Sequence, residues 1–446
     1  YPLDAFEEYQ IHKAIRWTQG ASLYGNPADE VLPEAYPPLY FWSLGRWLRT
    51  FGESFVAARL LSLAALVGIV GCGWWSLRDA ADRRVAGLVF LSVLLCFHPL
   101  TAKFYEVSKP DTLLTLLLAI AIVTGEHRSW VEILVSSGAM LLAGLTKQNA
   151  PLFLVPLCLS HALAGRWRWA LGWGTAMIGL IGGSYWLMNI FSSGQFFHWV
   201  FAWTAGHGID GWGGITRTLQ AIAIRGPLLL AVVGGSLVFH PRCRWTWCLI
   251  AALGVAALGM SKAGGRENHL LPAAFLGASI AGRWTASVWS NVQRDVHGSI
   301  LRWSIVAALA VTIWLALPAG RDFRWLTKRA GEAKDWVAAV RHIDGSVAVS
   351  HHLLLARRAG AECFFSDLIL EFPGLVVPTE VHDRISNQEF DYLVLNVDPA
   401  HSPTPGWLDV ISNNYLPAGE LEFMNRSDVL PRRLYVARRR APYNDK

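Results

Sequence analysis

Residues 108–125 read SKPDTLLTLLLAIAIVTG, and this stretch shows the pattern on which most of the chain is built. Pro110 suits the first turn of a helix, and Asp111 follows it where the helix dipole favours an acid. The run from Leu113 to Ile122 then carries no charge. A helix that crosses a bilayer needs roughly 20 mostly apolar residues. We therefore predict a membrane-spanning helix over 110–125 that begins with a carboxylate.

Similar apolar stretches recur through the first 318 residues, and the composition agrees with them. Hydrophobic residues make up 53% of the chain and charged residues only 16%, whereas a soluble domain carries about 25% charge. This deficit excludes a disordered chain and a nucleic-acid-binding arm, so we expect no nucleic-acid partner. The sequence predicts a polytopic α-helical membrane protein with about ten or eleven spans. The candidates besides 110–125 are 54–77, 86–102, 131–146, 150–165, 169–189, 226–240, 245–261, 269–284 and 301–318.

The arginines predict the orientation of these spans. Alternate loops carry eleven arginines, and the positive-inside rule assigns such loops to the cytoplasm. The outer side of an inner or plasma membrane then holds residues 1–53, the loop at 190–225 and everything after 318. The arginines are Arg78, Arg83, Arg84, Arg128, Arg166, Arg168, Arg242, Arg244, Arg283, Arg294 and Arg302.

Three regions follow from these patterns. Residues 1–53 predict a first outer loop with interfacial amphipathic helices near 4–19 and 39–50, and 54–318 form the transmembrane domain. After Pro318 the composition shifts, and 319–446 predicts an outer soluble α/β domain. Its expected helices are 321–342, 352–359 and 405–413, and its expected strands are 346–350, 391–397 and 433–437.

Two features of the sequence bear on processing and on cysteine chemistry. The chain begins at Tyr1 without Met or an apolar leader, which allows a trimmed protein that lacks an N-terminal anchor. The six cysteines show no metal-binding spacing, and we infer neither disulfides nor zinc from them.

Cations on the predicted outer side break the insertion rule and need a reason. One interpretation is that each side chain lies along the apolar surface with its charge in water. For the set as a whole, a shared anionic ligand is the better hypothesis, because Lys and Arg are natural phosphate partners. These residues are Lys103, Lys109, Lys147, Lys262 and Arg266.

Carboxylates on the same side are candidates for acid–base chemistry. Asp4, Glu7 and Glu8 share one face of the first amphipathic helix, where a carboxylate could be a general base or a metal ligand. The alternative is a solvated helix face near a helix N-terminus. Asp111 is a sharper candidate, since an ionisable residue at the mouth of a span is functional by default, although helix capping explains it as well.

Two short outer connections concentrate polar groups between apolar spans. Residues 146–151 read TKQNAP and include Gln148, while 261–269 read SKAGGRENH and include Asn268 and His269. Their glycines would let the backbone approach a ligand closely. A tight hydrated loop is the plainer interpretation of each, and a lone histidine is more often structural than catalytic.

Several of these pieces resemble motifs of GT-C-type polytopic glycosyltransferases, the superfamily of the protein O-mannosyltransferases and the lipid A aminoarabinose transferases. The pieces are spread over residues 1–275, each is short, and their order makes the resemblance. They are Asp4-x-x-Glu7, Leu23-Tyr24, Tyr36-Pro37-Pro38-Leu39-Tyr40, Arg59-Leu60-Leu61-Ser62, Lys109-Pro110-Asp111-Thr112-Leu113, Thr146-Lys147-Gln148 and Gly265 to Leu271.

The resemblance implies an enzyme that moves a sugar from a polyprenyl-phosphate carrier to an acceptor on the outer face, usually with inversion. The acceptor can be a lipid, a protein or a glycan. The base would be Asp4 or Glu7, although the family often has two adjacent acids there. Asp111 matches the second acid, which orients the acceptor or binds a metal. No cofactor is certain, and a divalent metal stays open. The expected substrate-binding residues are Glu8, Tyr40, Lys109, Lys147, Gln148, Lys262, Arg266, Asn268 and His269.

The main alternative is a polytopic transporter or a lipid flippase without transferase activity. Ten spans fit a transporter, but the ionisable residues gather at one predicted interface and not at the bilayer midplane. An enzyme should bring the first-loop acids, Asp111 and the lysines together above a groove. A transporter should have a central polar cavity instead.

Overall fold

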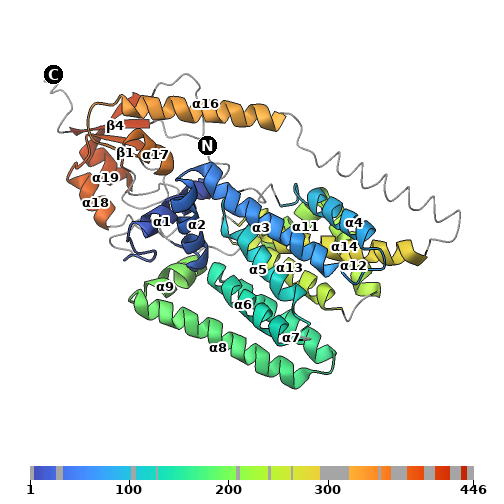
Figure 1. Cartoon of the computed structure of the whole chain (residues 1–446). Helices are drawn as coiled ribbons and strands as arrows, with labels where there is room; N and C mark the ends of the chain where they lie inside the picture. Colours follow the sequence, from blue (N-terminus) through green and yellow to red (C-terminus); the bar gives the residue numbers. More distant parts are fainter. Residues whose placement is uncertain are drawn as a thin grey trace. The chain divides into compact units, whose positions relative to one another are not determined.

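In the computed structural model, the chain folds into two compact units (Figure 1). The smaller unit comprises Tyr1–Ala35, Ser192–His207 and Pro318–Lys446, and the larger comprises Tyr36–Phe191 and Gly208–Leu317. The structure describes residues 5–26, 34–101, 107–126, 129–206, 211–239, 243–262, 265–291, 321–349, 353–362, 379–395, 407–421 and 433–438. Asp4, Lys103 and the predicted span at 301–318 lie outside these residues.

The larger unit is helical throughout its described residues. Polar side chains define where several helices begin: Ser54 accepts a hydrogen bond from Ala57 N, and Asp82 accepts from Arg84 N and Val85 N. Such N-caps satisfy backbone donors that a helix start leaves unpaired. The elements are α2 (Leu39–Phe51), α3 (Phe55–Ser76), α4 (Arg83–Cys96), α5 (Pro110–Val123), α6 (Trp130–Thr146), η1 (Ala150–Phe153), α7 (Leu154–Leu163), α8 (Trp167–Phe191), α11 (Gly211–Arg225), α12 (Pro227–Phe239), α13 (Arg244–Met260), η3 (Glu267–Leu270) and α14 (Leu271–Asn291).

Nine of the ten predicted apolar segments are helical over most of their length, and the tenth, at 301–318, lies outside the described residues; the predicted number of spans is not confirmed. Among the described residues, only α3 is long and apolar enough to cross a bilayer by itself, with a length of about 33 Å. The pair α11 and α12 would add a second span, although the two helices are bent by 105°. Several other apolar helices end before the apolar sequence does. The span predicted at 86–102, for example, is helical only to Cys96.

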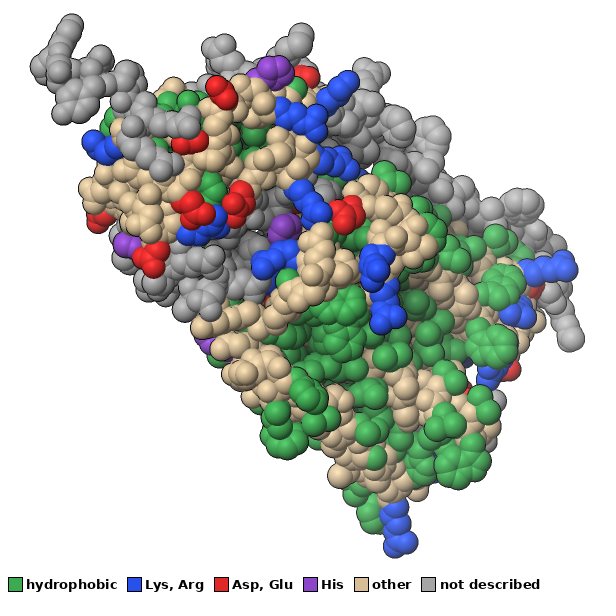
Figure 2. Space-filling view, turned by 60° about the vertical axis from the view of Figure 1, so that its left-hand side comes forward, with side chains coloured by type: hydrophobic (Ala, Val, Ile, Leu, Met, Phe, Trp, Pro, Cys, Tyr) green, Lys and Arg blue, Asp and Glu red, His purple; other side chains and the backbone are tan. Residues whose placement is uncertain are grey.

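The outer surface of the larger unit carries many large apolar side chains. Val67 is 72% exposed, Trp130 79%, Ile178 65% and Phe191 84%, on three different helices, α3, α6 and α8. Figure 2 shows such side chains lying next to one another over the helical part of the visible face. A soluble protein rarely exposes contiguous apolar patches beyond a few hundred Å². This surface is what helices in contact with lipid present.

The smaller unit combines a mixed sheet with short helices. The sheet order is β1-β2-β4-β3; β1 and β2 are parallel, and β4 is antiparallel to both β2 and β3. The elements are α1 (Ala5–Thr18), α9 (Gln195–Phe197), the π-helix η2 (His198–Trp203), α10 (Thr204–Gly206), α16 (Arg321–Arg341), β1 (Val347–Val349), α17 (Leu353–Ala359), α18 (Thr379–Ser386), β2 (Tyr392–Leu395), α19 (Trp407–Asn414), β3 (Tyr415–Glu420) and β4 (Arg433–Ala437).

Helices cover both faces of this sheet. Successive residues of β2 point to opposite faces, so Val394 packs in a core with Trp336 of α16 and with α17. Leu393 and Leu395 pack in the other core, with Val381 of α18 and with α19. The predicted α/β domain is therefore observed among the described residues of 319–446.

Several elements of the fold were not predicted, among them α18 (Thr379–Ser386), which lies between two of the expected strands. The interval 190–225, expected as a loop, contains α9, η2, α10 and α11, because its glycines and aromatic residues hide a helical pattern. Strand β3 was also missed, since Pro417 and Gly419 interrupt its apolar pattern. It lies at the sheet edge and its register shifts between these two residues, which is where a sheet tolerates proline.

Close packing of α4 against α14 gives a test of the larger unit. A Cβ at Gly282 would lie 2.7 Å from the carbonyl oxygen of Ala86, so Gly282→Ala must push the two helices apart. We expect a loss of about 1–3 kcal/mol, measured as a lower midpoint of thermal unfolding. Gly179→Ala on α8 is the matched control, because no atom lies within 4 Å of its added Cβ. Equal midpoints for the two variants would contradict the packing described here.

Candidate functional site

A buried ion pair is the centre of the candidate site. Lys147 Nζ lies 2.6 Å from Asp111 Oδ1, and the two side chains are 4% and 3% exposed. Asp111 stands in the first turn of α5, and Lys147 is the C-cap residue of α6. Both residues were predicted to belong to the site, and the fold brings them into direct contact although they are 36 residues apart in sequence. Such a pair is costly to bury and still more costly to break.

Further predicted residues surround this pair. The Asp111 carboxylate interacts electrostatically with Lys147 and His269 and through side-chain hydrogen bonds with Lys147 and Asn268. The ammonium groups of Lys109 and Lys262 interact electrostatically with the imidazole of His269. Lys109, Lys147 and Asn268 are buried, whereas Lys262 and His269 are half-buried. We call Lys109, Lys147 and Lys262, together with Asp111, the lysine cluster.

The lysine cluster carries more positive than negative charge. It comprises three ammonium groups and one carboxylate. Asp111 Oδ2 is buried and has no hydrogen-bond partner in the described part of the chain. Burial also lowers the pKa of Lys262, because the charged ammonium loses hydration there. Ammonium groups are natural hydrogen-bond donors to phosphate.

Neighbouring helices hold the approach to α5 in place. Tyr40 of α2 makes a hydrogen bond between its hydroxyl and Ser108 Oγ at 2.8 Å, and Ser62 of α3 donates to Val107 O at 2.9 Å. All of these side chains are buried. Tyr40 was predicted to bind substrate, and that role stays a prediction; its hydroxyl contacts the residue two positions before α5.

Two residues at the site were not singled out from the sequence. The Tyr36 ring lies 5.4 Å from Lys147 Nζ, a cation–π distance. Its position before Pro37-Pro38 was visible, but nothing in the sequence linked it to Lys147. A Cβ at Gly259 would lie 2.5 Å from Cγ of His269. Only a residue without a side chain leaves room for that imidazole.

Two predicted residues are less closely involved. Arg266 is exposed, and no described contact joins it to the lysine cluster. The adjacent Glu267 pairs instead with Arg225, with Nη1 and Oε1 2.8 Å apart. Gln148 is half-buried in the turn after Lys147.

The first-helix acids belong to the smaller unit. Glu7 and Glu8 are 0% and 2% exposed, so the alternative of a solvated helix face does not describe them. Glu8 Oε1 accepts a hydrogen bond from Leu355 N at 2.8 Å, near the start of α17. The expected convergence of these acids with Asp111 stays a prediction, and Asp4 lies outside the described residues.

The described residues offer no obvious metal site. No group of three or more His, Cys, Asp and Glu side chains stands together among them. Asp111 was the acid predicted to bind a metal, but its carboxylate already forms an ion pair with Lys147.

Comparison with known proteins identifies the fold. Two crystal structures of ArnT from Cupriavidus metallidurans match nearly the whole chain. The structure bound to undecaprenyl phosphate has a TM-score of 0.62 at 14% identity and covers 98% of this chain and 94% of that one. The apo structure has a TM-score of 0.63 at 16% identity, with coverages of 97% and 93%.

This chain has the fold of ArnT. This likeness agrees with the predicted GT-C-like fold, although the predicted number of spans is not confirmed in the described part of the chain. No protein-family model matches the sequence, and no curated protein does so either. The identity of about one residue in seven explains why only short motifs were recognisable in the sequence.

The ion pair between Asp111 and Lys147 leads to a testable prediction about stability. Asp111→Asn leaves a buried ammonium without its counter-ion, and we expect a loss of about 3–5 kcal/mol in stability. Adding Lys147→Gln removes that ammonium and should restore much of the stability. Urea unfolding of the single and double variants measures both effects. Additive losses in the double variant would show that the two side chains do not interact.

Proposed function

We propose that this chain is a membrane glycosyltransferase that takes a sugar from a polyprenyl-phosphate donor and passes it to an acceptor on the outer face. The observation that carries the proposal is the lysine cluster, in which Lys147 pairs with the buried Asp111 in a chain with the fold of ArnT. One of the matching ArnT structures was determined with bound undecaprenyl phosphate. Lys109, Lys147 and Lys262 would hold the equivalent phosphate here.

The fixed charges would act on the leaving group. When the bond between the anomeric carbon and the phosphate oxygen breaks, its electron pair goes to the polyprenyl phosphate, which becomes more negative. Ammonium groups already in place at that oxygen stabilise the developing charge in a water-poor site. Asp111 would hold Lys147 in position, and its free Oδ2 could accept a hydrogen bond from a substrate hydroxyl.

A carboxylate of the first helix would supply the base. It takes a proton from the acceptor hydroxyl or amine as the acceptor atom bonds to the anomeric carbon. Attack from the face opposite the phosphate gives inversion. Asp4 or Glu7 is the base that the resemblance to the GT-C enzymes implies.

The acceptor and the location complete the proposal. The acceptor carries a hydroxyl or an amine and belongs to a lipid, a protein or a glycan. The exposed apolar surface of the larger unit supports a position within the membrane. The arginine-rich loops support a cytoplasmic placement of the opposite helix ends, which puts the lysine cluster on the outer side.

A transfer assay tests the function and its base. Membranes from a knockout strain that express the chain are supplied with a panel of radiolabelled polyprenyl-phosphate sugars, and label in the acceptor fraction is counted. We expect Asp4→Asn or Glu7→Gln to abolish transfer, because an amide cannot accept the acceptor proton.

The matched control for the base is Asp82→Asn. Asp82 caps α4 at the other end of the larger unit's helices, and Asn caps a helix about as well as Asp. Full transfer by both acid variants would refute the assignment of the base. Donor binding without transfer by the wild type would favour a flippase or a transporter.

The lowered pKa of Lys262 predicts how donor affinity depends on pH. Because burial lowers this pKa, the ammonium loses its proton at a lower pH than that of an exposed lysine. Binding of the anionic donor should therefore weaken as the pH rises through that value. Lys262→Arg keeps its charge at all these pH values and should remove the decline.

Donor affinity is measured from pH 6 to 10 by equilibrium titration. The control is Lys334→Arg, an exposed residue of α16 that should leave the pH profile unchanged. A profile for Lys262→Arg that matches the wild type would exclude Lys262 from phosphate binding.

A further inference from the structure

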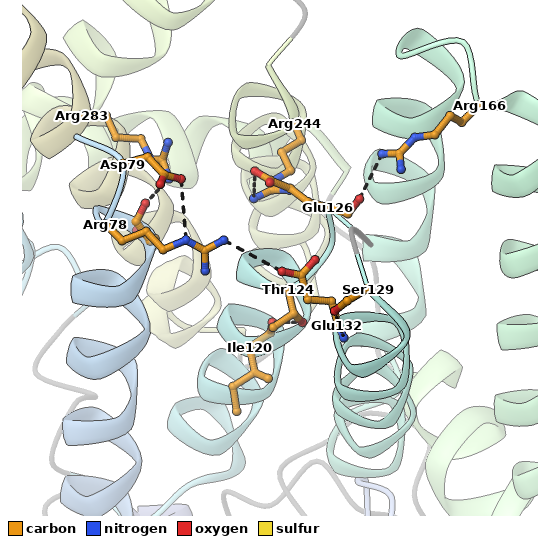
Figure 3. A network of polar contacts seen from close by, with 11 residues as sticks. Arg78, Asp79, Ile120, Thr124, Glu126, Ser129, Glu132, Arg166, Arg244 and Arg283 are labelled. Carbon is orange, nitrogen blue, oxygen red and sulfur yellow. Dashed lines mark hydrogen bonds and ion pairs between the residues drawn. The ribbon is translucent and has the colours of Figure 1, made fainter. Parts of the chain in front are cut away.

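A network of arginines and carboxylates joins helix ends of the larger unit, at the opposite ends of α5, α6 and α13 from the lysine cluster (Figure 3). Arg244, at the start of α13, has its Nη2 3.0 Å from Oε1 of Glu126, which follows α5. Arg78, after α3, lies 3.7 Å from Asp79 and 4.0 Å from Glu132 at the start of α6. These contacts tie together helices that are far apart in sequence.

Two arginines of this network have no carboxylate partner. Arg283 of α14 donates from Nη2 to the carbonyl of Ser76, and Arg166 donates to the carbonyl of Glu126 at 3.1 Å. Neither lies within 4.0 Å of a carboxylate oxygen of the described residues. Among the described residues, Arg78 and Arg244 are thus paired with carboxylates, whereas Arg283 and Arg166 bond only to backbone carbonyls.

Unsatisfied donors mark where a ligand would lie. Nε of Arg244 and Nε of Arg283 are both buried and have no acceptor within the described ranges. Their guanidinium carbons lie 5.6 and 5.0 Å from the ring centre of Trp245, which is buried. Buried polar groups are nearly always paired. Two guanidinium groups beside one ring, each with a buried donor that no described residue accepts from, therefore indicate a binding site for an anion.

The surroundings indicate which kind of anion this is. Indole rings at these same helix ends are exposed: Trp74 is 40% exposed, Trp75 55%, Trp130 79% and Trp167 54%. Tryptophan gathers where membrane meets water, so this end of the helices lies at the level of lipid headgroups. Guanidinium groups bind phosphate with paired, nearly parallel hydrogen bonds.

We propose that Arg244 and Arg283, with Arg78 and Arg166 beside them, bind the phosphate headgroup of an anionic phospholipid. Basic pockets between helices at a membrane surface recognise such headgroups. The bound phosphate would accept from the buried Nε donors and would hold α13 and α14 against α3. This inference is independent of the proposed sugar transfer, because it concerns the opposite ends of the helices.

Lipid titration of the purified full chain in detergent tests the proposal. Phosphatidylglycerol, phosphatidylcholine or inorganic phosphate is added, and the midpoint of thermal unfolding is followed, with native mass spectrometry to count retained lipid. Phosphatidylglycerol should raise the midpoint, whereas phosphatidylcholine should not. Arg283→Gln should weaken the affinity for phosphatidylglycerol about tenfold. The control is Arg84→Gln, an exposed arginine at the start of α4, which should change it less than about twofold.

Each contrary result overturns the proposal. Equal effects of the two lipids, or of the two variants, would show that the arginines serve only the ion-pair network. Stabilisation by inorganic phosphate as strong as that by phosphatidylglycerol would overturn the assignment to a lipid. If Arg283→Gln does not fold, Arg283→Lys replaces it; an unchanged lipid affinity in that variant would exclude a bidentate phosphate contact.

Discussion

The larger unit depends on the ion pair between Asp111 and Lys147. A carboxylate and an ammonium that are almost entirely removed from water stabilise the fold only while they remain together. This requirement fixes the end of α6 against the start of α5, and it restricts where the following residues of each helix can pack. Tyr40, Ser62 and Tyr36 then complete the site from other helices. Removal of either charge would therefore disturb both the fold and the proposed chemistry.

The helices α5, α6 and α13 connect two polar sites of different composition. One end carries lysines around a single carboxylate, and the other carries arginines among three carboxylates. With 14 to 17 residues each, these helices are only about 21–26 Å long. The apolar layer between the two sites is thus slightly thinner than the roughly 30 Å of a bilayer core.

The smaller unit shows how local chemistry joins segments distant in sequence. The carboxylate of Glu8 accepts from Leu355 N across 347 residues, and Trp199 donates to the carbonyl of Gly25. These bonds place α1 in one compact unit with the C-terminal sheet. A proposed base on α1 would thus share a unit with the α/β domain, so changes in that domain could act on the base.

The sequence by itself determined the helical class, the positions of most apolar helices and the residue types of the candidate site. It did so because apolar length, capping residues and misplaced charges are local features. Only the tertiary structure decided that Lys147 pairs with Asp111, that Arg266 is exposed and that Glu8 bonds to α17. It also decided that Gly259 makes room for His269. These outcomes depend on which helices pack against each other, and a chain whose partners are 36 or 347 residues apart carries no local sign of that choice.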